Sequence, residues 1–534
     1  MDPSQTTTVF NSDRFLLLDI VPIICEQANS ISGRIAVLNA LARTCRLFYE
    51  PALTCLWSEL SSIAPLVKCL PADAWEEVEN NNMKTLQLTR PIVGSDIHRM
   101  QFHARLVKVF RFDSYTKPQV LYNTFAGLGE ILMKERVLFL PNIDELSWLV
   151  LSDRDLTLLG LFLARNVRKL SILISGQSAR LQAALIDALE LLKYCRRIRW
   201  FEIGALPIYD LAPVQIISRT VCGLTDLHTL SLSSLSSEAF THVASLPHLQ
   251  NLTLTDVGTI SQFMLPVPPT VPFSALQQAI FLKCHSADIG TALFHAVSHS
   301  PLVQLNVHID CRPKGELEQC LLKIPYTHHA AHKSLETLHL VSTISTMGVE
   351  FPTDMFTTDA DTVDADISVM DINIFTMDTL RPLFVFINLQ SLALQLSTGF
   401  DVNDVEVEEI GRAWPRLVEL TLWLPKSQAH DRPHVTLKGV VALSQLCPNL
   451  KYLRIAFDAS PDAVSAAGSF LEQGVVNNTL FMLHNPSAWP IGDAEQISSV
   501  LNVMFPELYL VTGESEVWTE VGKKAGSMLR GMRL

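Results

Sequence analysis

Apolar residues recur along this chain in short triplets, with two residues between the first and second apolar positions and one between the second and third. Two segments show the pattern most clearly: RLVELTLWL (residues 416–424) and NLKYLRIAF (residues 449–457). The last two apolar positions alternate with polar ones, which is typical of a β-strand. One such strand cannot bury its apolar face alone, so the pattern predicts neighbouring strands that carry the same triplet.

Copies of the triplet follow one another over most of the chain, and most are 21 to 33 residues apart. That spacing is typical of leucine-rich repeats in which a helix returns the chain to the next strand. Residues 181–195, LQAALIDALELLKYC, predict such a helix. The predicted fold class is therefore α/β: a solenoid over residues 83–512, built as a curved parallel sheet with outer helices. Clear copies begin at Met83, Val107, Leu146, Val167, Ile198, Leu227, Leu249, Leu302, Leu335, Leu389, Leu417 and Leu450, and a weaker one lies near Leu276.

Two stretches interrupt or follow these repeats. Residues 345–380 form an acidic insertion, and no Lys or Arg occurs between Ser334 and Leu380. We expect a solvated loop here, with an arm that captures a basic partner or folds over the concave face as the alternative. Calcium binding is a weaker option, since the segment lacks the glycine and terminal glutamate of a calcium-binding loop. Near the C-terminus, residues 505–511 predict a last strand and residues 513–534 a tail, whose basic end at residues 522–534 we expect to be frayed.

The N-terminal 82 residues carry a different pattern. We expect a mobile terminus at 1–12, a small helical domain at 13–60 and a helical transition at 61–82. Within the domain, residues 13–27 predict one helix, and Pro51 is placed to begin another that carries Leu53, Leu56 and Trp57. From the helical pattern alone, we expect this domain to cap the open end of the solenoid. Helical spacing places six residues on one expected core face: Ile35, Leu38, Leu41, Ala42, Cys45 and Phe48.

Residues 41–46 (LARTCR), Phe48, residues 50–53 (EPAL), residues 56–57 (LW) and residues 59–60 (EL) together resemble an F-box. The segment is similar to the divergent F-box at the head of many leucine-rich-repeat proteins of mushroom-forming fungi. Family members open their first helix with a Leu-Pro pair, which this chain lacks at residues 18–21. The resemblance covers residues 13–60 and the repeat architecture that follows.

The resemblance implies that the helical domain binds the small adaptor subunit of a cullin–RING ubiquitin ligase. The repeats would then hold a protein substrate, and the chain itself would not be an enzyme. The alternative hypothesis is a repeat scaffold for protein interactions with a helical cap and no ligase role. The residues expected to bind the adaptor are Ile20, Val21, Leu38, Leu41, Phe48, Pro51, Leu53 and Trp57.

On the predicted concave face, the residues between the buried positions of each strand are available to a substrate. Trp423 is the strongest of these candidates, because exposed aromatic side chains are frequent binding hot spots. The residues expected to bind substrate are Asn306, His308, His339, Gln395, Thr421, Trp423 and Arg454.

The composition of the chain argues against nucleic-acid binding, a membrane span and secretion. Apolar residues make up 48% of the 534 residues and charged residues 18%, which is typical of an ordered chain with a large core. The net charge of −13 argues against nucleic acid as a partner. The longest uncharged apolar run, residues 156–164, is too short to span a membrane. The ten cysteines form no C-x-x-C pair, and the N-terminus does not resemble a signal peptide, so we expect a cytoplasmic or nuclear protein.

No motif for a catalytic site, metal or cofactor stands out. His328 and His332 are four residues apart, as some zinc ligands are, but no cysteine or acidic residue close by in the sequence completes a set. A loop before the next strand is the better interpretation. We therefore expect no cofactor and no metal site.

Overall fold

A computed structural model describes residues 9–80, 83–112, 119–175, 178–204, 211–257, 271–284, 287–309, 324, 328–342, 375–395, 400–422, 432–471, 477, 479–487, 489–513 and 515–525. The chain divides into two compact units, Met1–Ser233 and Ser234–Leu534.

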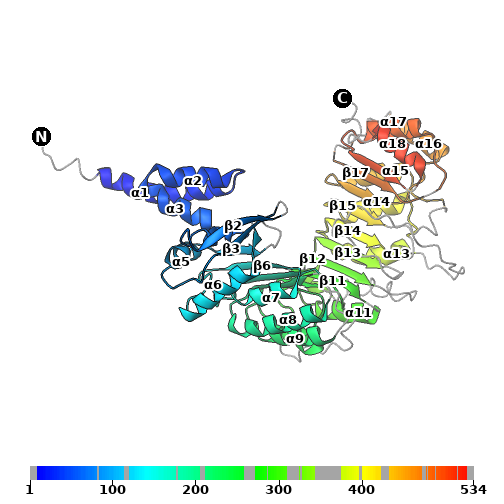
Figure 1. The fold of residues 1–534 in the computed structure, drawn as a ribbon. Helices are drawn as coiled ribbons and strands as arrows, with labels where there is room; N and C mark the ends of the chain where they lie inside the picture. Colours follow the sequence, from blue (N-terminus) through cyan, green and yellow to red (C-terminus); the bar gives the residue numbers. More distant parts are fainter. Residues whose placement is uncertain are drawn as a thin grey trace. The chain divides into compact units, whose positions relative to one another are not determined.

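Fifteen strands of the described residues form a long parallel sheet, which confirms the predicted parallel ladder (Figure 1). Six belong to the first unit and are ordered β1-β4-β6-β7-β8-β9; nine belong to the second and run in chain order from β10 to β18. The first six are β1 (Glu59–Leu60), β4 (Val109–Phe112), β6 (Glu145–Val150), β7 (Lys169–Ile174), β8 (Trp200–Gly204) and β9 (Thr229–Leu232). The other nine are β10 (Asn251–Leu254), β11 (Gln278–Cys284), β12 (Gln304–Ile309), β13 (Thr337–Ser342), β14 (Ser391–Gln395), β15 (Glu419–Leu422), β16 (Tyr452–Arg454), β17 (Met482–Asn485) and β18 (Leu510–Gly513).

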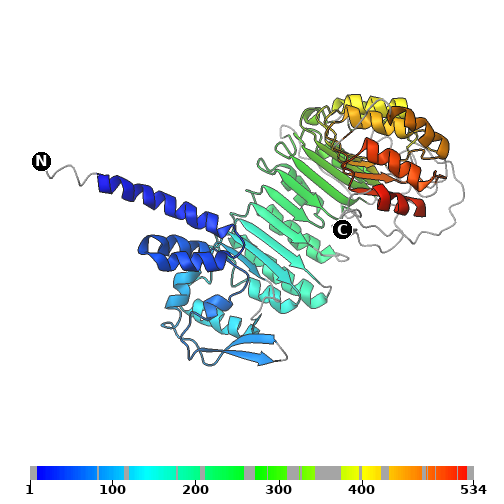
Figure 2. The same ribbon diagram turned by 90° about the horizontal axis from the view of Figure 1, so that it is seen from above.

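In each unit, helices lie against one face of the strands (Figures 1 and 2). Several begin at side chains that cap free backbone N–H groups, as Ser178, Ser236, Thr436 and Asp493 do. In the first unit the helices after β1 are α4 (Ala64–Val67), α5 (His98–Ala104), α6 (Tyr122–Lys134), α7 (Asp153–Leu159), α8 (Ala179–Glu190), η2 (Leu191–Tyr194) and α9 (Leu211–Cys222). In the second they are α10 (Ser237–Ala244), α11 (Ala287–Ala296), η3 (His329–Ala331), α13 (Met377–Leu380), η4 (Arg381–Val385), α14 (Asp404–Ala413), α15 (Leu437–Leu446), α16 (Pro461–Leu471), α17 (Ala494–Met504) and α18 (Glu516–Ala525).

The core lies between the strands and these helices. The second apolar residue of each triplet is aligned across neighbouring strands, as in the row Leu338, Leu392, Leu420, Leu453 and Leu483. All five side chains are buried. The alternate residues of the same strands are mostly half-buried and point away from the helices. The apolar side chains of the triplet therefore pack against the helices, and the residues between them form the opposite face of the sheet.

The predicted repeat at Met83 is wrong. Residues Met83–Leu88 form β3, which lies in a separate three-stranded sheet with β2 (Trp75–Asn80) and β5 (Gln119–Val120). β3 pairs antiparallel with β2, so this segment is half of a hairpin. The transition at 61–82 is accordingly only partly helical, because it contains both α4 and β2.

The repeat near Leu146 is real, but its predicted alignment is off by three residues. Leu146 pairs with Phe110 and Leu170, which are the second apolar residues of their triplets. The first residue of this triplet is therefore Ile143 and the third is Trp148, both fully buried. A tryptophan takes the place of the third leucine, and it stacks on Phe112 with ring centroids 4.1 Å apart.

The N-terminal helices also begin and end differently from the prediction. The first, α1 (Val9–Asn29), begins within the segment expected to be a mobile terminus. The second, α2 (Arg34–Thr44), ends before Cys45, whose extended backbone separates it from α3 (Arg46–Trp57). Pro51 therefore lies inside α3 and does not begin it. The extended backbone at Cys45 turns the chain so that Ala52 joins Leu38 in one core.

Two predictions about the second unit need correction. Part of the expected basic tail forms α18, which buries Trp518 completely. Most of the acidic insertion lies outside the described residues, but its last residues, from Phe375, belong to the core. Phe375 is 6% exposed and Leu380 is fully buried, so the inserted segment ends before Phe375.

Candidate functional site

The three-helix head, defined as α1, α2 and α3, is held together by a small apolar core. Val21, Cys25, Leu38 and Ala52 are buried in it. Leu41 and Phe48 pack against this core and keep part of their surface exposed. Among the residues predicted to bind an adaptor, Val21 and Leu38 therefore stabilise the head and cannot contact a partner.

Much of the outer surface of the head is apolar. On α1, Ile20, Ile23 and Ile24 are 44%, 55% and 42% exposed. Their spacing of three and four residues places them on one face of the helix. The predicted core face of α2 is partly wrong, because Ile35 is 60% exposed and Cys45 is exposed as well. Further exposed apolar side chains of the head are Ile31, Val37, Leu47 and Tyr49.

Trp57 connects the head to the rest of the first unit. Its ring stacks on His103 of α5, with centroids 4.2 Å apart and planes 22° apart. Burial lowers the pKa of His103, so the neutral imidazole is favoured in this stack. The other two predicted docking residues of α3, Pro51 and Leu53, are half-buried. Trp57 thus has a structural contact that the sequence did not indicate.

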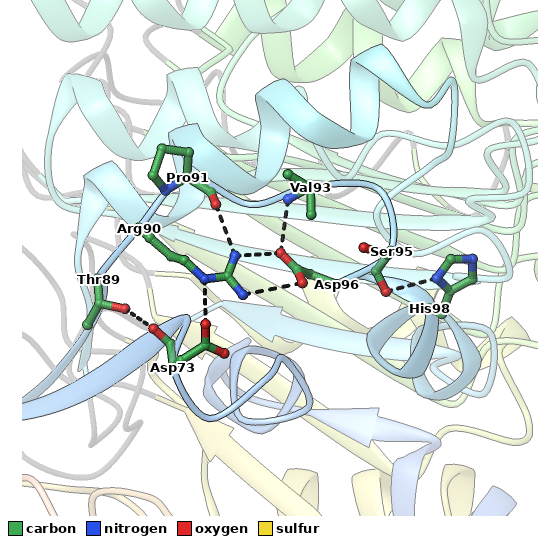
Figure 3. Close-up of polar contacts among 8 residues, drawn as sticks. All are labelled: Asp73, Thr89, Arg90, Pro91, Val93, Ser95, Asp96 and His98. Atoms are coloured by element: carbon green, nitrogen blue, oxygen red, sulfur yellow. Dashed lines mark hydrogen bonds and ion pairs between the residues drawn. The ribbon is translucent and has the colours of Figure 1, made fainter.

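The charged side chains of a polar cluster in the first unit are paired with one another (Figure 3). Arg90 donates from Nε to Asp73 at 2.8 Å and from Nη1 to Asp96 at 2.7 Å, and Asp96 also accepts from the Val93 N–H at 3.0 Å. The hydrogen bonds from Arg90 lower the pKa of both carboxyl groups. These contacts tie the segment after β3 to the turn before β2. The cluster therefore stabilises the first unit, and its charges are already paired.

In the second unit, six of the seven predicted substrate-binding residues lie in two neighbouring rows of the sheet. Asn306, His339, Thr421 and Arg454 lie in one register row across β12, β13, β15 and β16, with Ala393 of β14 between them. His308 and Gln395 belong to a second row, on either side of Val341. Of the six predicted residues in these rows, only Thr421 is buried, at 9% exposure. Trp423 lies outside the described residues.

A chain of hydrogen bonds crosses three strands beside these rows. Nε2 of His339 lies 2.7 Å from Oγ of Ser391, and that hydroxyl donates to Oε2 of Glu419 at 2.8 Å. Burial lowers the pKa of His339, and the Glu419 carboxylate opposes this effect. Burial also lowers the pKa of His308 to about 4. At neutral pH this part of the sheet therefore offers neutral imidazoles and one carboxylate.

The end of this surface was not predicted from the sequence. His484 of β17 continues the first row beside Arg454, and its Nδ1 lies 2.8 Å from Oγ1 of Thr512 in β18. Phe481 and Tyr509, the residues directly before β17 and β18, are exposed and stack with ring centroids 4.8 Å apart, and Phe481 also packs edge-on against Tyr452 of β16. The only sequence signal was Leu480 and Leu483 at the right spacing, followed by Asn485 where an apolar residue was expected.

Three histidines of the second unit make its stability sensitive to acid: His328 is buried, and His308 and His484 are half-buried. Burial lowers the pKa of His308 and His328 to about 4 and that of His484 to about 3. Below about pH 6.5 the unfolded chain binds protons that the folded chain does not, so stability falls as pH drops from 6.5 towards 4. We expect up to ~3 kcal/mol from a group such as His308. Urea unfolding at pH 7.5 and pH 4.5 measures the loss, and the His308→Gln/His484→Gln variant should lose less.

Other kinds of site find no support in the described part of the chain. Its His, Cys, Asp and Glu side chains form no group of three that could hold a metal ion. No helix there is both long and apolar enough to cross a lipid bilayer. Comparison with known proteins adds no assignment: no protein-family model matches the chain, and the search of curated proteins returned no significant match.

Proposed function

We propose that this chain is a substrate-recognition subunit of a cullin–RING ubiquitin ligase, with the three-helix head bound to the small adaptor subunit. One observation carries the proposal. Of the 25 large apolar side chains exposed in the described residues, eight lie between residues 20 and 49. A folded domain rarely leaves so much apolar surface exposed unless a partner buries it. The F-box resemblance of residues 13–60 identifies the kind of partner.

The head residues then divide between two roles. Val21, Cys25, Leu38 and Ala52 hold the helices together. Ile20, Ile23 and Ile24 form the apolar face on α1 that the adaptor would bury. A protein interface of ordinary size buries about 800 Å² on each partner, which this face and the exposed residues of α2 and α3 could supply together.

In this proposal the sheet is a leucine-rich-repeat solenoid, and its open face holds the protein substrate. The polar row from Asn306 to His484 supplies hydrogen-bonding groups. The stacked pair Phe481 and Tyr509, 41% and 37% exposed, supplies the aromatic surface typical of binding hot spots. The chain itself transfers no ubiquitin. It raises the effective concentration of substrate near the subunits that do.

A second function, a scaffold with a helical cap, is favoured by two contacts. Trp57 stacks on His103, and β1, which follows α3 directly, pairs with β4 as the first strand of the sheet. The head therefore also adjoins the first strand of the ladder, where a cap would lie. Capping does not account for the exposed isoleucines on α1, which is why the adaptor role is preferred.

Calorimetric titration of the full-length chain with the purified adaptor separates the two functions. The ligase role predicts a one-to-one complex with a dissociation constant of about 1 µM or tighter. A folded chain that releases no heat and co-elutes with no adaptor at ten times that concentration would reject the ligase role and leave the cap.

A further inference from the structure

A basic hollow of about 360 Å³ lies at the edge of the first unit's sheet, where the chain enters the strands. Lys108, Asp144 and Arg168 immediately precede β4, β6 and β7, and Arg197 lies three residues before β8. Backbone hydrogen bonds of 2.8 Å connect Asp144 N–H to the Lys108 carbonyl and Arg168 N–H to the Asp144 carbonyl. The parallel register thus brings these side chains to one place.

The charges around the hollow are not balanced. Its lining holds three cations, Lys108, Arg168 and Arg197, and one carboxylate, Asp144. Asp144 lies 3.4 Å from Arg168. No carboxylate of the described residues forms an ion pair with either Lys108 or Arg197. The surrounding segment, residues 105–200, has 15 Lys and Arg against 9 Asp and Glu, a net charge of +6 in a chain of −13. A local positive potential of this kind attracts anions.

Two asparagine amides are positioned beside these cations. The Asn142 side chain donates to the Arg105 carbonyl at 2.8 Å, and the Asn166 side chain donates to the Pro141 carbonyl at 3.2 Å. An amide nitrogen carries two N–H groups, so each side chain keeps a second donor. Because the first bond holds each amide in place, these donors are oriented before any ligand arrives.

We propose that this hollow binds a phosphorylated side chain of a protein segment. The guanidinium groups of Arg168 and Arg197 can each present two parallel N–H donors to phosphate oxygens, and Lys108 adds a compact positive charge. A phosphate monoester carries a charge of about −1.5 to −2 at neutral pH, which complements three cations and one carboxylate. We take this phosphorylated segment to be part of the substrate, and only that identification rests on the proposed function.

A degenerate peptide array tests the proposal with the full-length chain. Each peptide carries phosphoserine, serine or glutamate at its centre, between randomised positions. We expect at least tenfold stronger retention on phosphoserine peptides than on either of the others. The Lys108→Glu/Arg197→Glu variant should lose that preference. Equal retention on the three sets, or no retention on any, overturns the proposal.

The matched control makes the same charge change at the other end of the strands. Arg154 and Arg180 are exposed and lie in the first turns of α7 and α8. The Arg154→Glu/Arg180→Glu variant should keep the phosphoserine preference; if it loses the preference equally, the effect is general charge and the site is refuted. Unchanged circular dichroism for both variants excludes unfolding.

Removing the carboxylate of Asp144 from the hollow should strengthen phosphopeptide binding. Asp144→Asn should bind a phosphoserine peptide several-fold more tightly, and inorganic phosphate should compete at millimolar concentration. If a single-stranded oligonucleotide displaces the peptide more effectively than inorganic phosphate at equal phosphate concentration, the hollow binds nucleic acid and the proposal fails. None of these measurements includes the adaptor, so their failure would leave the proposed function of the head untouched.

Discussion

Replacing Ile20 and Ile24 with glutamate should weaken adaptor binding by at least 100-fold while the head stays folded. The two side chains are 44% and 42% exposed and one helical turn apart on α1. Glutamate is tolerated there in the free chain, because its carboxylate stays in water. In the complex, two carboxylates would be buried against an apolar partner surface, where unpaired charges are strongly unfavourable. A 100-fold loss corresponds to about 2.8 kcal/mol, and calorimetric titration measures it directly.

Two controls separate this effect from simpler causes. The Ile387→Glu/Val405→Glu variant makes the same change at two apolar positions of the second unit that are 55% and 71% exposed, and it should bind the adaptor normally. Leu38→Ala should lose binding for a different reason. Leu38 is 1% exposed in the head core, so its truncation removes ~2–5 kcal/mol and unfolds the head. If Ile20→Glu/Ile24→Glu binds like the wild type, the apolar face on α1 is not the docking surface.

Trp518→Ala should lower the free energy of unfolding of the second unit by ~3–5 kcal/mol, the usual range for a buried tryptophan. Trp518 is fully buried and packs edge-on against Phe457, with ring centroids 5.7 Å apart. It holds α18 over β18, the last strand of the ladder. Urea unfolding followed by far-ultraviolet circular dichroism measures the loss. Hydrogen exchange of residues 508–513 should accelerate in parallel, since that strand would lose its cover.

Gly513 provides an independent test of the same packing. A Cβ at this position would overlap the indole ring of Trp518, so Gly513→Ala should also destabilise the unit, by ~1–3 kcal/mol. Thr519→Ala, at an exposed position of the same helix, should change stability by less than about 0.5 kcal/mol. A Trp518→Ala variant as stable as the wild type would mean that α18 is frayed, as the sequence alone suggested for its last residues, from Gly522.

The ladder could be predicted from the sequence because the triplet has a direct physical cause. Each strand must bury two apolar positions against the helices, and the preceding turn adds a third. The pattern failed where another residue type filled a core position. Asn485 takes the third position of β17 and satisfies its amide by donating to the Phe457 carbonyl at 2.8 Å. Gly513 takes the third position of β18 because Trp518 occupies the space.

The remaining errors have a different origin. The triplet at Met83 has the right spacing, but pairing with Trp75–Asn80 makes it a hairpin, and spacing within one segment cannot reveal that. In the head, apolar residues surround short helices on several sides. Whether Leu38 or Ile35 is buried depends on how three helices pack, which helical periodicity does not determine. The basic hollow unites side chains from four turns, so no local motif marked it.

In the proposed function, one chain connects a ligase adaptor to a substrate through separate surfaces. Affinity purification of the tagged wild type and of Ile20→Glu/Ile24→Glu from the same cells tests it most directly. We expect the adaptor and its cullin with the wild type, and their loss from the variant while other bound proteins remain. Recovery of no adaptor with the wild type, or loss of every bound protein from a folded variant, would contradict the account.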